Sequence, residues 1–244
     1  KVLCLLPFEP RELHDLNGPE GVYVGHPLTE RLVELRPGPE EKAMRQDAGR
    51  PLVLVLPGSR GSEIGRLLKV FGDSTARIAT LYPHARFVLP AVPHLETRIR
   101  AETSSWPVQP EIVVGEAAKM AAFRVARAAL AASGTVTLEL ALAGVPTVAA
   151  YKVSAPEAAL ARRLIRVPSV ILPNLILGEK AVPEFLQQDA TPKALTDAVL
   201  VLLAEGAARQ AQISAFERLD QLMKLDEGSP SEVAFRNIMN FIVA

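Results

Sequence analysis

The sequence predicts an α/β protein whose core is a doubly wound parallel sheet. After residue 51, short apolar runs alternate with segments of helical periodicity, which is the order of strand–helix–strand units. The runs are continuously apolar, as in strands covered by helices on both faces. With 244 residues, of which 49% are hydrophobic, the chain is long enough to bury a sizeable core.

The strand candidates follow one another along the chain with helical patterns between most of them. They are residues 51–56, 85–89, 111–114, 128–132, 146–151 and 169–172. In open parallel sheets, ligands bind outside the carboxyl ends of the strands. We therefore expect a site in the turns that follow these runs.

The carboxyl-terminal part is predicted to be helical. Apolar residues recur at helical spacing over 191–205 and over 207–225. A Gly-Ser-Pro sequence then interrupts the pattern before a last amphipathic helix over 231–243. We assign residues 51–227 to one ligand-binding domain and residues 228–244 to a terminal helix.

The amino end has a different organisation. Residues 1–6 are typical of a core strand and residues 22–24 of a second short strand, and two lone strands do not make a stable domain. We expect residues 1–27 to be the remnant of an amino-terminal domain that has been cut away. We assign residues 28–50 to a linker, of which residues 36–50, rich in Pro, Glu, Lys and Gly, are typical of a solvated connector or a capped short helix.

A small-residue turn follows the run 128–132. Ser133, Gly134 and Thr135 supply flexible backbone and hydroxyl groups where the next helix begins, and the bare N–H groups of a helix start favour an anion. Glu139 lies one turn further on, where its carboxylate would repel a phosphate but could accept two ribose hydroxyls. The alternative is an ordinary strand-to-helix turn without a ligand.

A second turn of this kind follows the run 51–56. Gly58 and Gly61 permit a tight turn, and Arg60 offers a planar fork suited to phosphate oxygens. Two such turns favour a diphosphate. Neither turn matches a Walker loop or Gly-x-Gly-x-x-Gly, which argues against an ATPase or an ordinary NAD enzyme. Glu63 either caps its own helix or takes part in the site, and an unliganded turn is again the alternative.

Charge and composition argue against several classes of protein. The 27 basic and 27 acidic residues balance, so no global field recruits nucleic acid, and three Tyr and one Trp offer little base stacking. The lone Cys4 is predicted to be a core residue, which fits a reducing cytoplasm. Apolar runs such as 140–151 are too short to span a bilayer. We predict a cytoplasmic protein without a nucleic-acid partner.

No metal or other cofactor is predicted. The sequence contains no Asp-x-Asp motif, and its four histidines show no paired spacing for zinc. Residues 152–166 are basic and interleaved with apolar residues; the charged residues are Lys152, Glu157, Arg162, Arg163 and Arg166. This stretch is either a helix at a membrane surface or a solvated helix packed on the sheet.

Five motifs occur in a fixed order through nearly the whole chain. They are Leu-Leu-Pro-Phe-Glu at 5–9, Tyr-Val-Gly-His-Pro-Leu at 23–28, Leu-Pro-Gly-Ser-Arg-Gly-Ser-Glu at 56–63, Ala-Ser-Gly-Thr-Val-Thr-Leu-Glu at 132–139, and Leu-Pro-Asn-Leu-Ile at 172–176 followed by Pro-Glu-Phe-Leu-Gln at 183–187. Together they resemble the lipid-A-disaccharide synthases, GT-B glycosyltransferases of Gram-negative lipid A assembly. Many nucleotide-sugar transferases share the Ser-Gly-Thr to Glu segment. Leu-Pro-Gly-Ser-Arg combined with Leu-Pro-Asn-Leu is much more specific.

The resemblance implies an inverting transfer of 2,3-diacylglucosamine from its UDP donor to 2,3-diacylglucosamine 1-phosphate, which yields a β-1,6 disaccharide and UDP. It implies a catalytic role for Arg60, whose charge would stabilise the leaving diphosphate without a metal. The implied donor-binding residues are Gly58, Ser59, Arg60, Glu63, Ser133, Gly134, Thr135, Val136, Thr137, Glu139, Asn174 and Gln187. Without the resemblance, Asn174 and Gln187 would be interpreted as a turn-capping Asn and a helix-surface Gln.

The resemblance also implies parts that this chain lacks. GT-B enzymes bind the acceptor, and generally draw the catalytic base, from an amino-terminal domain, so we expect the chain alone to form no disaccharide. We assign neither Glu9 nor His26 as the base. An anionic, acylated substrate is consistent with a peripheral position on the inner membrane, and the family tends towards dimers with interlocking carboxyl-terminal segments.

Two other functions stay open at this point. Another GT-B enzyme, such as a UDP-sugar epimerase, would share the Ser-Gly-Thr to Glu segment but would not need Leu-Pro-Asn-Leu. A nucleotide-sugar-binding subunit would work with a separate acceptor chain. The gene sequence upstream of Lys1 distinguishes an enzyme fragment from such a subunit, because an in-frame acceptor domain indicates a fragment and a stop codon indicates a subunit.

Overall fold

A six-stranded, fully parallel sheet forms the centre of the computed structural model, which describes residues 1–154, 156–157 and 168–243. The strand order is β5-β4-β3-β6-β7-β8. The strands are β3 (Leu52–Leu56), β4 (Arg86–Ala91), β5 (Glu111–Val114), β6 (Ala128–Ala132), β7 (Thr147–Tyr151) and β8 (Glu184–Leu186). The predicted α/β class and parallel sheet are confirmed.

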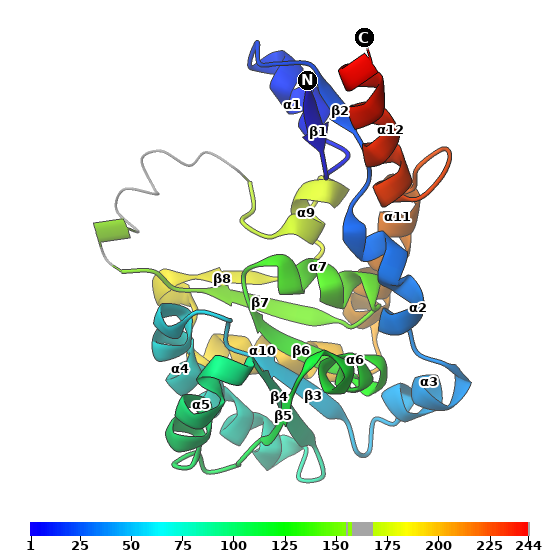
Figure 1. Cartoon of the computed structure of the whole chain (residues 1–244). Helices are drawn as coiled ribbons and strands as arrows, with labels where there is room; N and C mark the ends of the chain where they lie inside the picture. The colour runs from blue at the N-terminus through cyan, green and yellow to red at the C-terminus, as the bar shows by residue number, and fades with distance from the viewer. Residues whose placement is uncertain (155, 158–167, 244) are drawn as a thin grey trace.

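Helices cover both faces of the sheet (Figure 1). One face carries α4 (Gly61–Leu81), α5 (Glu96–Thr103) and α10 (Pro192–Leu203). The other carries α6 (Glu116–Val125), α7 (Thr135–Leu142), α9 (Leu172–Leu177) and α11 (Ala207–Leu222). Every residue of β3 and β6 is buried, and alternate residues enter the two layers: Val53 and Val55 pack with α4, whereas Leu54 and Leu56 belong to the opposite core. This burial on both faces explains the continuously apolar runs.

The predicted strand over residues 169–172 is wrong. Local side chains take the backbone groups that a strand would need: Glu184 Oε2 accepts from Val170 N–H at 3.1 Å, and Ser169 Oγ accepts from Ile171 N–H at 3.2 Å. Pro173 then occupies the first turn of α9, where its fixed φ suits a helix start. The edge strand of the sheet is instead β8, which pairs with β7.

The amino-terminal residues form a small unit beside the sheet domain. It consists of β1 (Val2–Cys4), α1 (Glu9–Asp15) and β2 (Gly21–Tyr23), with β1 and β2 paired in parallel. The Tyr23 hydroxyl donates to Met223 O at 2.8 Å, at the end of α11. The last helix, α12 (Pro230–Val243), lies beside this unit, so both termini are at the same end of the molecule (Figure 1).

The segment 28–50 contains helical turns that pack on the sheet domain. They are η1 (Pro27–Arg31), α2 (Leu32–Leu35) and α3 (Pro39–Gln46). Leu28 and Leu35 are buried in the same core cluster as β3 and β6. The segment predicted as a linker or capped short helix therefore contributes apolar side chains to the core, while the domain boundaries themselves stay predictions.

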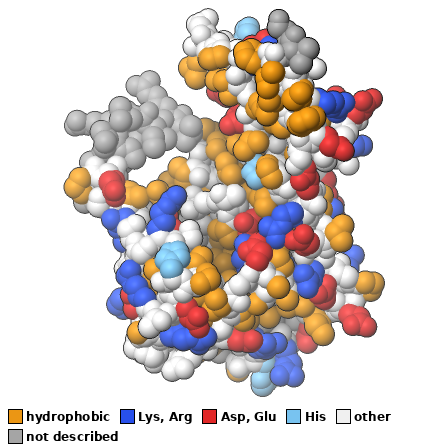
Figure 2. All heavy atoms as spheres, viewed as in Figure 1, with side chains coloured by type: hydrophobic (Ala, Val, Ile, Leu, Met, Phe, Trp, Pro, Cys, Tyr) orange, Lys and Arg blue, Asp and Glu red, His pale blue; other side chains and the backbone are white. Residues whose placement is uncertain are grey.

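Hydrophobic side chains gather at the end of the molecule where α12 lies (Figure 2). Its exposed apolar residues are Phe235, Ile238, Met239, Phe241 and Ile242. Among the described helices, none combines the length and hydropathy needed to cross a membrane. The basic stretch over 152–166 falls mostly on residues outside the described part of the chain, so its helix stays a prediction.

Candidate functional site

A cleft of about 340 Å³ lies at the carboxyl ends of the central strands. From β3 the chain proceeds to β4 and β5 on one side, and later to β6 and β7 on the other. The cleft is therefore at the topological switch point, where doubly wound sheets bind ligands. Its lining comes from four strand ends and the turns after them: Leu56, Gly58, Ser59, Arg60, Glu63, Pro90, Ala91, Val92, Pro93, Gly115, Glu116, Lys119, Ala132, Ser133, Gly134, Thr135, Val136 and Glu139.

The turn between β3 and α4 is closed by its own glutamate. Glu63 Oε2 accepts from Ser59 N–H at 3.1 Å and from Arg60 N–H at 3.3 Å. Gly58 has a φ of +117°, and a Cβ there would lie 2.5 Å from Glu63 Oε2, so only glycine fits under this carboxylate. Of the two roles considered for Glu63, the structure shows the helix cap. The carboxylate occupies N–H groups that could also bind an anionic ligand.

Arg60 extends from the same turn. Its Nη1 lies 2.9 Å from Glu63 Oε1, and its side chain is 80% exposed. Because the guanidinium end of this ion pair is open to solvent, the pair contributes little stability, and Arg60 can exchange Glu63 for a ligand at small cost. Arg60 thus lines the cleft, and its contact with a ligand stays a prediction.

The turn between β6 and α7 forms the opposite wall. Ser133, Gly134, Thr135 and Val136 line the cleft, and the first turn of α7 starts there. Ser133 N–H donates to Ala150 O at 2.9 Å and its hydroxyl to Val170 O at 3.1 Å, which fixes the turn against β7. A helix start beside a cleft offers backbone donors and the positive end of the dipole to an anion.

Thr137 is not in the cleft lining among the described residues. Its hydroxyl donates to Gly134 O at 2.7 Å, and the side chain is buried. In this structure Thr137 stabilises the turn from within. A direct contact of its hydroxyl with phosphate would require that internal hydrogen bond to break.

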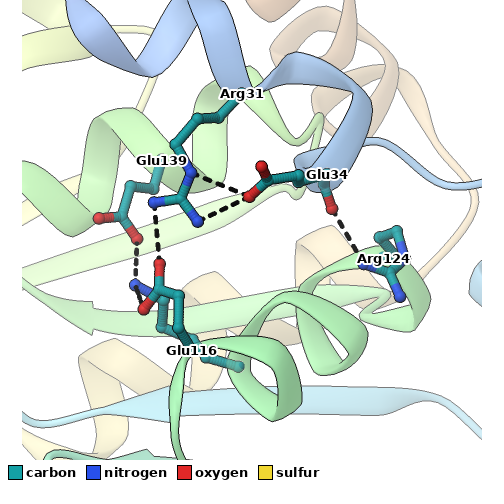
Figure 3. A network of polar contacts seen from close by, with 6 residues as sticks. Arg31, Glu34, Glu116, Arg124 and Glu139 are labelled. Carbon is teal, nitrogen blue, oxygen red and sulfur yellow. Dashed lines mark hydrogen bonds and ion pairs between the residues drawn. The ribbon is translucent and has the colours of Figure 1, made fainter.

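Glu139 lies one turn into α7, with its side chain 15% exposed in the cleft wall. Its Oε2 lies 2.9 Å from Lys119 Nζ, and the same ammonium lies 3.1 Å from Glu116 Oε2, on α6. Arg31 Nη1, on η1, is 3.0 Å from Glu116 Oε1 (Figure 3). Burial acts to raise the pKa of Glu116, but the hydrogen bonds and charges of Lys119 and Arg31 outweigh it, and the pKa is lowered. Both cations therefore face an ionised Glu116.

The network of ion pairs around Glu116 extends to α2, the helix that follows η1. Arg31 Nη2 pairs with Glu34 Oε2 at 2.7 Å, and Arg124 donates to the backbone O of Glu34 at 2.9 Å (Figure 3). The cleft wall is thus linked by polar contacts to α2.

Asn174 and Gln187 lie apart from the cleft lining in this structure. Asn174 is buried; its Nδ2 donates to Val182 O at 2.9 Å and its Oδ1 accepts from Val182 N–H at 2.8 Å. Gln187 Oε1 accepts from Val153 N–H at 3.3 Å beyond the end of β7. Both amides thus hold backbone segments near the carboxyl edge of the sheet, and their contact with a ligand stays a prediction.

The sequence analysis did not identify several residues that line the cleft. Glu116 and Lys119 are on α6, and Gly115 and Pro90 lie at the ends of β5 and β4. The sequence did indicate that Gly115 and Glu116 directly follow a predicted strand, where ligands bind. This turn was not identified as part of the site because it has no motif typical of phosphate binding. The role of Lys119 becomes visible only when α6 and α7 are packed side by side.

The two residues of the amino-terminal unit that were considered as bases act as local caps. Glu9 Oε2 accepts from Leu6 N–H at 2.8 Å, and His26 Nδ1 accepts from Leu28 N–H at 3.1 Å. Burial lowers the pKa of His26, and the negative charge of Glu9 partly opposes this. Among the described residues, no group of three or more His, Cys, Asp or Glu side chains is arranged to hold a metal ion.

The fold is shared with a UDP-GlcNAc 2-epimerase and with the carboxyl-terminal domain of a glycosyl transferase. The UDP-GlcNAc 2-epimerase of Neisseria meningitidis, solved with UDP-GlcNAc, matches with a TM-score of 0.60 and 15% identity over 98% of this chain and 61% of that one. The carboxyl-terminal domain of a group 1 glycosyl transferase from Francisella tularensis matches with a TM-score of 0.51 and 11% identity, over 78% and 95% of the two chains. These likenesses define the class, an α/β domain of the GT-B fold.

Comparison of the sequence with known proteins identifies the family within this fold class. The family model for lipid-A-disaccharide synthetase matches residues 1–238. The lipid-A-disaccharide synthase of Rhodopseudomonas palustris strain HaA2 is 51% identical over 241 residues, covering 99% of this chain and 61% of the relative. That of Bradyrhizobium diazoefficiens is 52% identical over 233 residues, covering 96% and 59%. The chain belongs to the lipid-A-disaccharide synthetase family, and it spans about 60% of the length of these relatives.

Proposed function

We propose that the cleft binds the UDP-linked 2,3-diacylglucosamine donor of a lipid A glycosyltransferase. The observation that carries this proposal is the meeting of two strand-to-helix turns and Glu139 in one cleft, in a chain of this family. Its volume of about 340 Å³ is within the range of small-molecule sites, about 300–1,000 Å³. The donor's nucleotide would occupy it, and the acylated sugar would extend outside.

Each wall of the cleft supplies a different part of the recognition. Arg60 would contact the diphosphate, and the start of α7, from Gly134 to Val136, would bind phosphate through its backbone N–H groups. Glu139 would accept the ribose hydroxyls. As the glycosidic bond breaks, negative charge grows on the diphosphate, and the Arg60 guanidinium would stabilise it.

The proposed reaction is an inverting transfer to 2,3-diacylglucosamine 1-phosphate that gives the β-1,6 disaccharide and UDP. Acceptor binding and the catalytic base are assigned to the part of the relatives that this chain does not match. Family membership favours this function over an epimerase, and a binding subunit with a separate acceptor chain is the second candidate. Association with the membrane surface and dimer formation stay predictions.

The ribose role of Glu139 provides the test of this proposal. Glu139→Ala is expected to weaken UDP binding about tenfold more than 2′-deoxy-UDP binding, because a hydrogen bond to a charged group contributes roughly 1.5–3 kcal/mol. Calorimetry on both nucleotides measures this difference. Glu111→Ala is a matched control, since Glu111 lies at the opposite end of the sheet. Equal losses for the two nucleotides would make Glu139 a structural residue.

A second expected result concerns Glu63, whose carboxylate holds the N–H groups of Ser59 and Arg60. Glu63→Gln keeps an acceptor for the turn and removes the negative charge that a diphosphate would meet. UDP affinity should rise by about 1 kcal/mol, roughly fivefold, and the gain should shrink at high salt. Titrations at two ionic strengths check this, with Glu111→Gln as the control. Weaker binding by Glu63→Gln would indicate that the carboxylate supports the liganded turn.

A further inference from the structure

Lys119 is the cation of the cleft wall that the donor-binding roles above leave unassigned. Its ammonium lies between two carboxylates from two different helices, Glu139 on α7 and Glu116 on α6, at 2.9 and 3.1 Å. It also lies 5.8 Å from the centroid of the Phe123 ring. The Lys119 side chain is 21% exposed, so these contacts are partly shielded from water.

The two carboxylates face one another across this ammonium. Burial acts to raise the pKa of Glu116, but Lys119 and Arg31 lower it below its ordinary value, so Glu116 stays ionised at neutral pH. Arg31 offsets the charge of Glu116 from the side of η1, whereas Lys119 is the cation that contacts Glu139 among the described residues. Without the ammonium, two negative groups would share this wall, and their repulsion would turn the Glu139 side chain away from its present position.

The contact with Lys119 leaves Glu139 able to bind a ligand. A carboxylate has about four acceptor positions on two oxygens, and Lys119 contacts Oε2. The other oxygen of Glu139 points away from that contact (Figure 3). The pair thus fixes the rotamer of Glu139 while an oxygen stays available for hydroxyl groups.

We propose that Lys119 is a positioning residue, which aims Glu139 at the ribose hydroxyls and thereby gives the site its selectivity for ribonucleotides. The inference rests on the proposed ribose role of Glu139 and adds the group that holds it. Lys119 acts through Glu139 here, without a contact to the nucleotide of its own.

The test compares UDP with 2′-deoxy-UDP on the 244-residue chain and on Lys119→Met, Lys119→Arg, Glu139→Ala and the Lys119→Met/Glu139→Ala double variant. Lys119→Met should reduce the preference for UDP from about tenfold to less than about twofold, while the Kd for 2′-deoxy-UDP changes less than about threefold. Lys119→Arg should retain most of the preference. In the Glu139→Ala background, Lys119→Met should have no further effect on it.

Lys69→Met is the matched control, because Lys69 pairs with Asp73 on the exposed face of α4. Circular dichroism melting of each variant checks the fold, and Lys119→Arg keeps the test valid if Lys119→Met is unstable. If Lys119→Met retains the preference for UDP over 2′-deoxy-UDP, the positioning role of Lys119 is overturned, while the ribose role of Glu139 is not. An equal loss for both nucleotides overturns it as well, since it indicates a direct contact. A wild-type chain that binds both nucleotides equally overturns the positioning role together with the ribose role of Glu139.

Discussion

Replacing Arg60 with alanine is expected to lower kcat a hundredfold or more and to change the donor KM far less. The diphosphate gains negative charge as the glycosidic bond breaks, so the attraction to a guanidinium is stronger in the transition state than in the bound donor. Removal of one preorganised donor of this kind typically raises the barrier by about 3–4 kcal/mol. The structure supports this role, because the Arg60 side chain lies at the cleft and is 80% exposed, so it is accessible to a ligand.

Arg60→Lys should restore only part of this loss, since lysine keeps the charge but lacks the planar, two-pronged contact. Steady-state kinetics would be measured on this chain joined to the part of a full-length relative that it does not match. Arg86→Ala is the control, because Arg86 pairs with Glu111 at the far end of the sheet. An unchanged kcat with a raised KM would mean that Arg60 only holds the donor.

Arg127→Met is expected to destabilise the fold by about 3–5 kcal/mol, because it leaves several backbone carbonyls without their donor, at about 1–3 kcal/mol for each one that stays buried and unpaired. Arg127 is completely buried. Its guanidinium donates to Leu203 O at 2.8 Å, to Gln46 O at 3.0 Å and to Glu205 Oε1 at 2.6 Å. It therefore satisfies carbonyls at the ends of both α10 and α3.

Denaturant unfolding at pH 7 measures this loss, with Arg86→Met as the exposed control. The hydrogen bond and charge of Arg127 lower the pKa of Glu205. This contribution is present above the unfolded-state pKa of Glu205 and is lost as the pH falls through its lowered folded-state pKa. The difference between wild type and Arg127→Met should therefore shrink in acid. A loss below about 1 kcal/mol would show that water replaces the guanidinium at these carbonyls.

The sheet could be predicted because its strands are recognisable one at a time. The runs at β3 and β6 are apolar throughout, and burial on both faces requires that pattern. The strand expected at 169–172 failed for a reason that no hydropathy pattern contains: Ser169 and Glu184 take the backbone N–H groups there. The true edge strand, β8, has three residues and mixed polarity, which is too short a signal.

The site could be predicted only where local sequence determines it. The turns at Arg60 and Ser133 were found because each follows a buried strand directly, and both line the cleft. Lys119 was not identified because its contact with Glu139 depends on how closely α6 and α7 pack, which the sequence does not show. Arg127 was missed because a charged residue is rarely buried completely, and its partners come from the ends of other helices.

Calorimetric titration of UDP into the 244-residue chain, with and without EDTA, is the direct test of the proposed nucleotide site. Arg60 and the helix start at Thr135 provide the positive potential of the proposed site, and neither depends on a metal. Saturable binding of one UDP per chain is expected, with an affinity that chelation leaves unchanged. Absence of binding, or an affinity that collapses in EDTA, would contradict it.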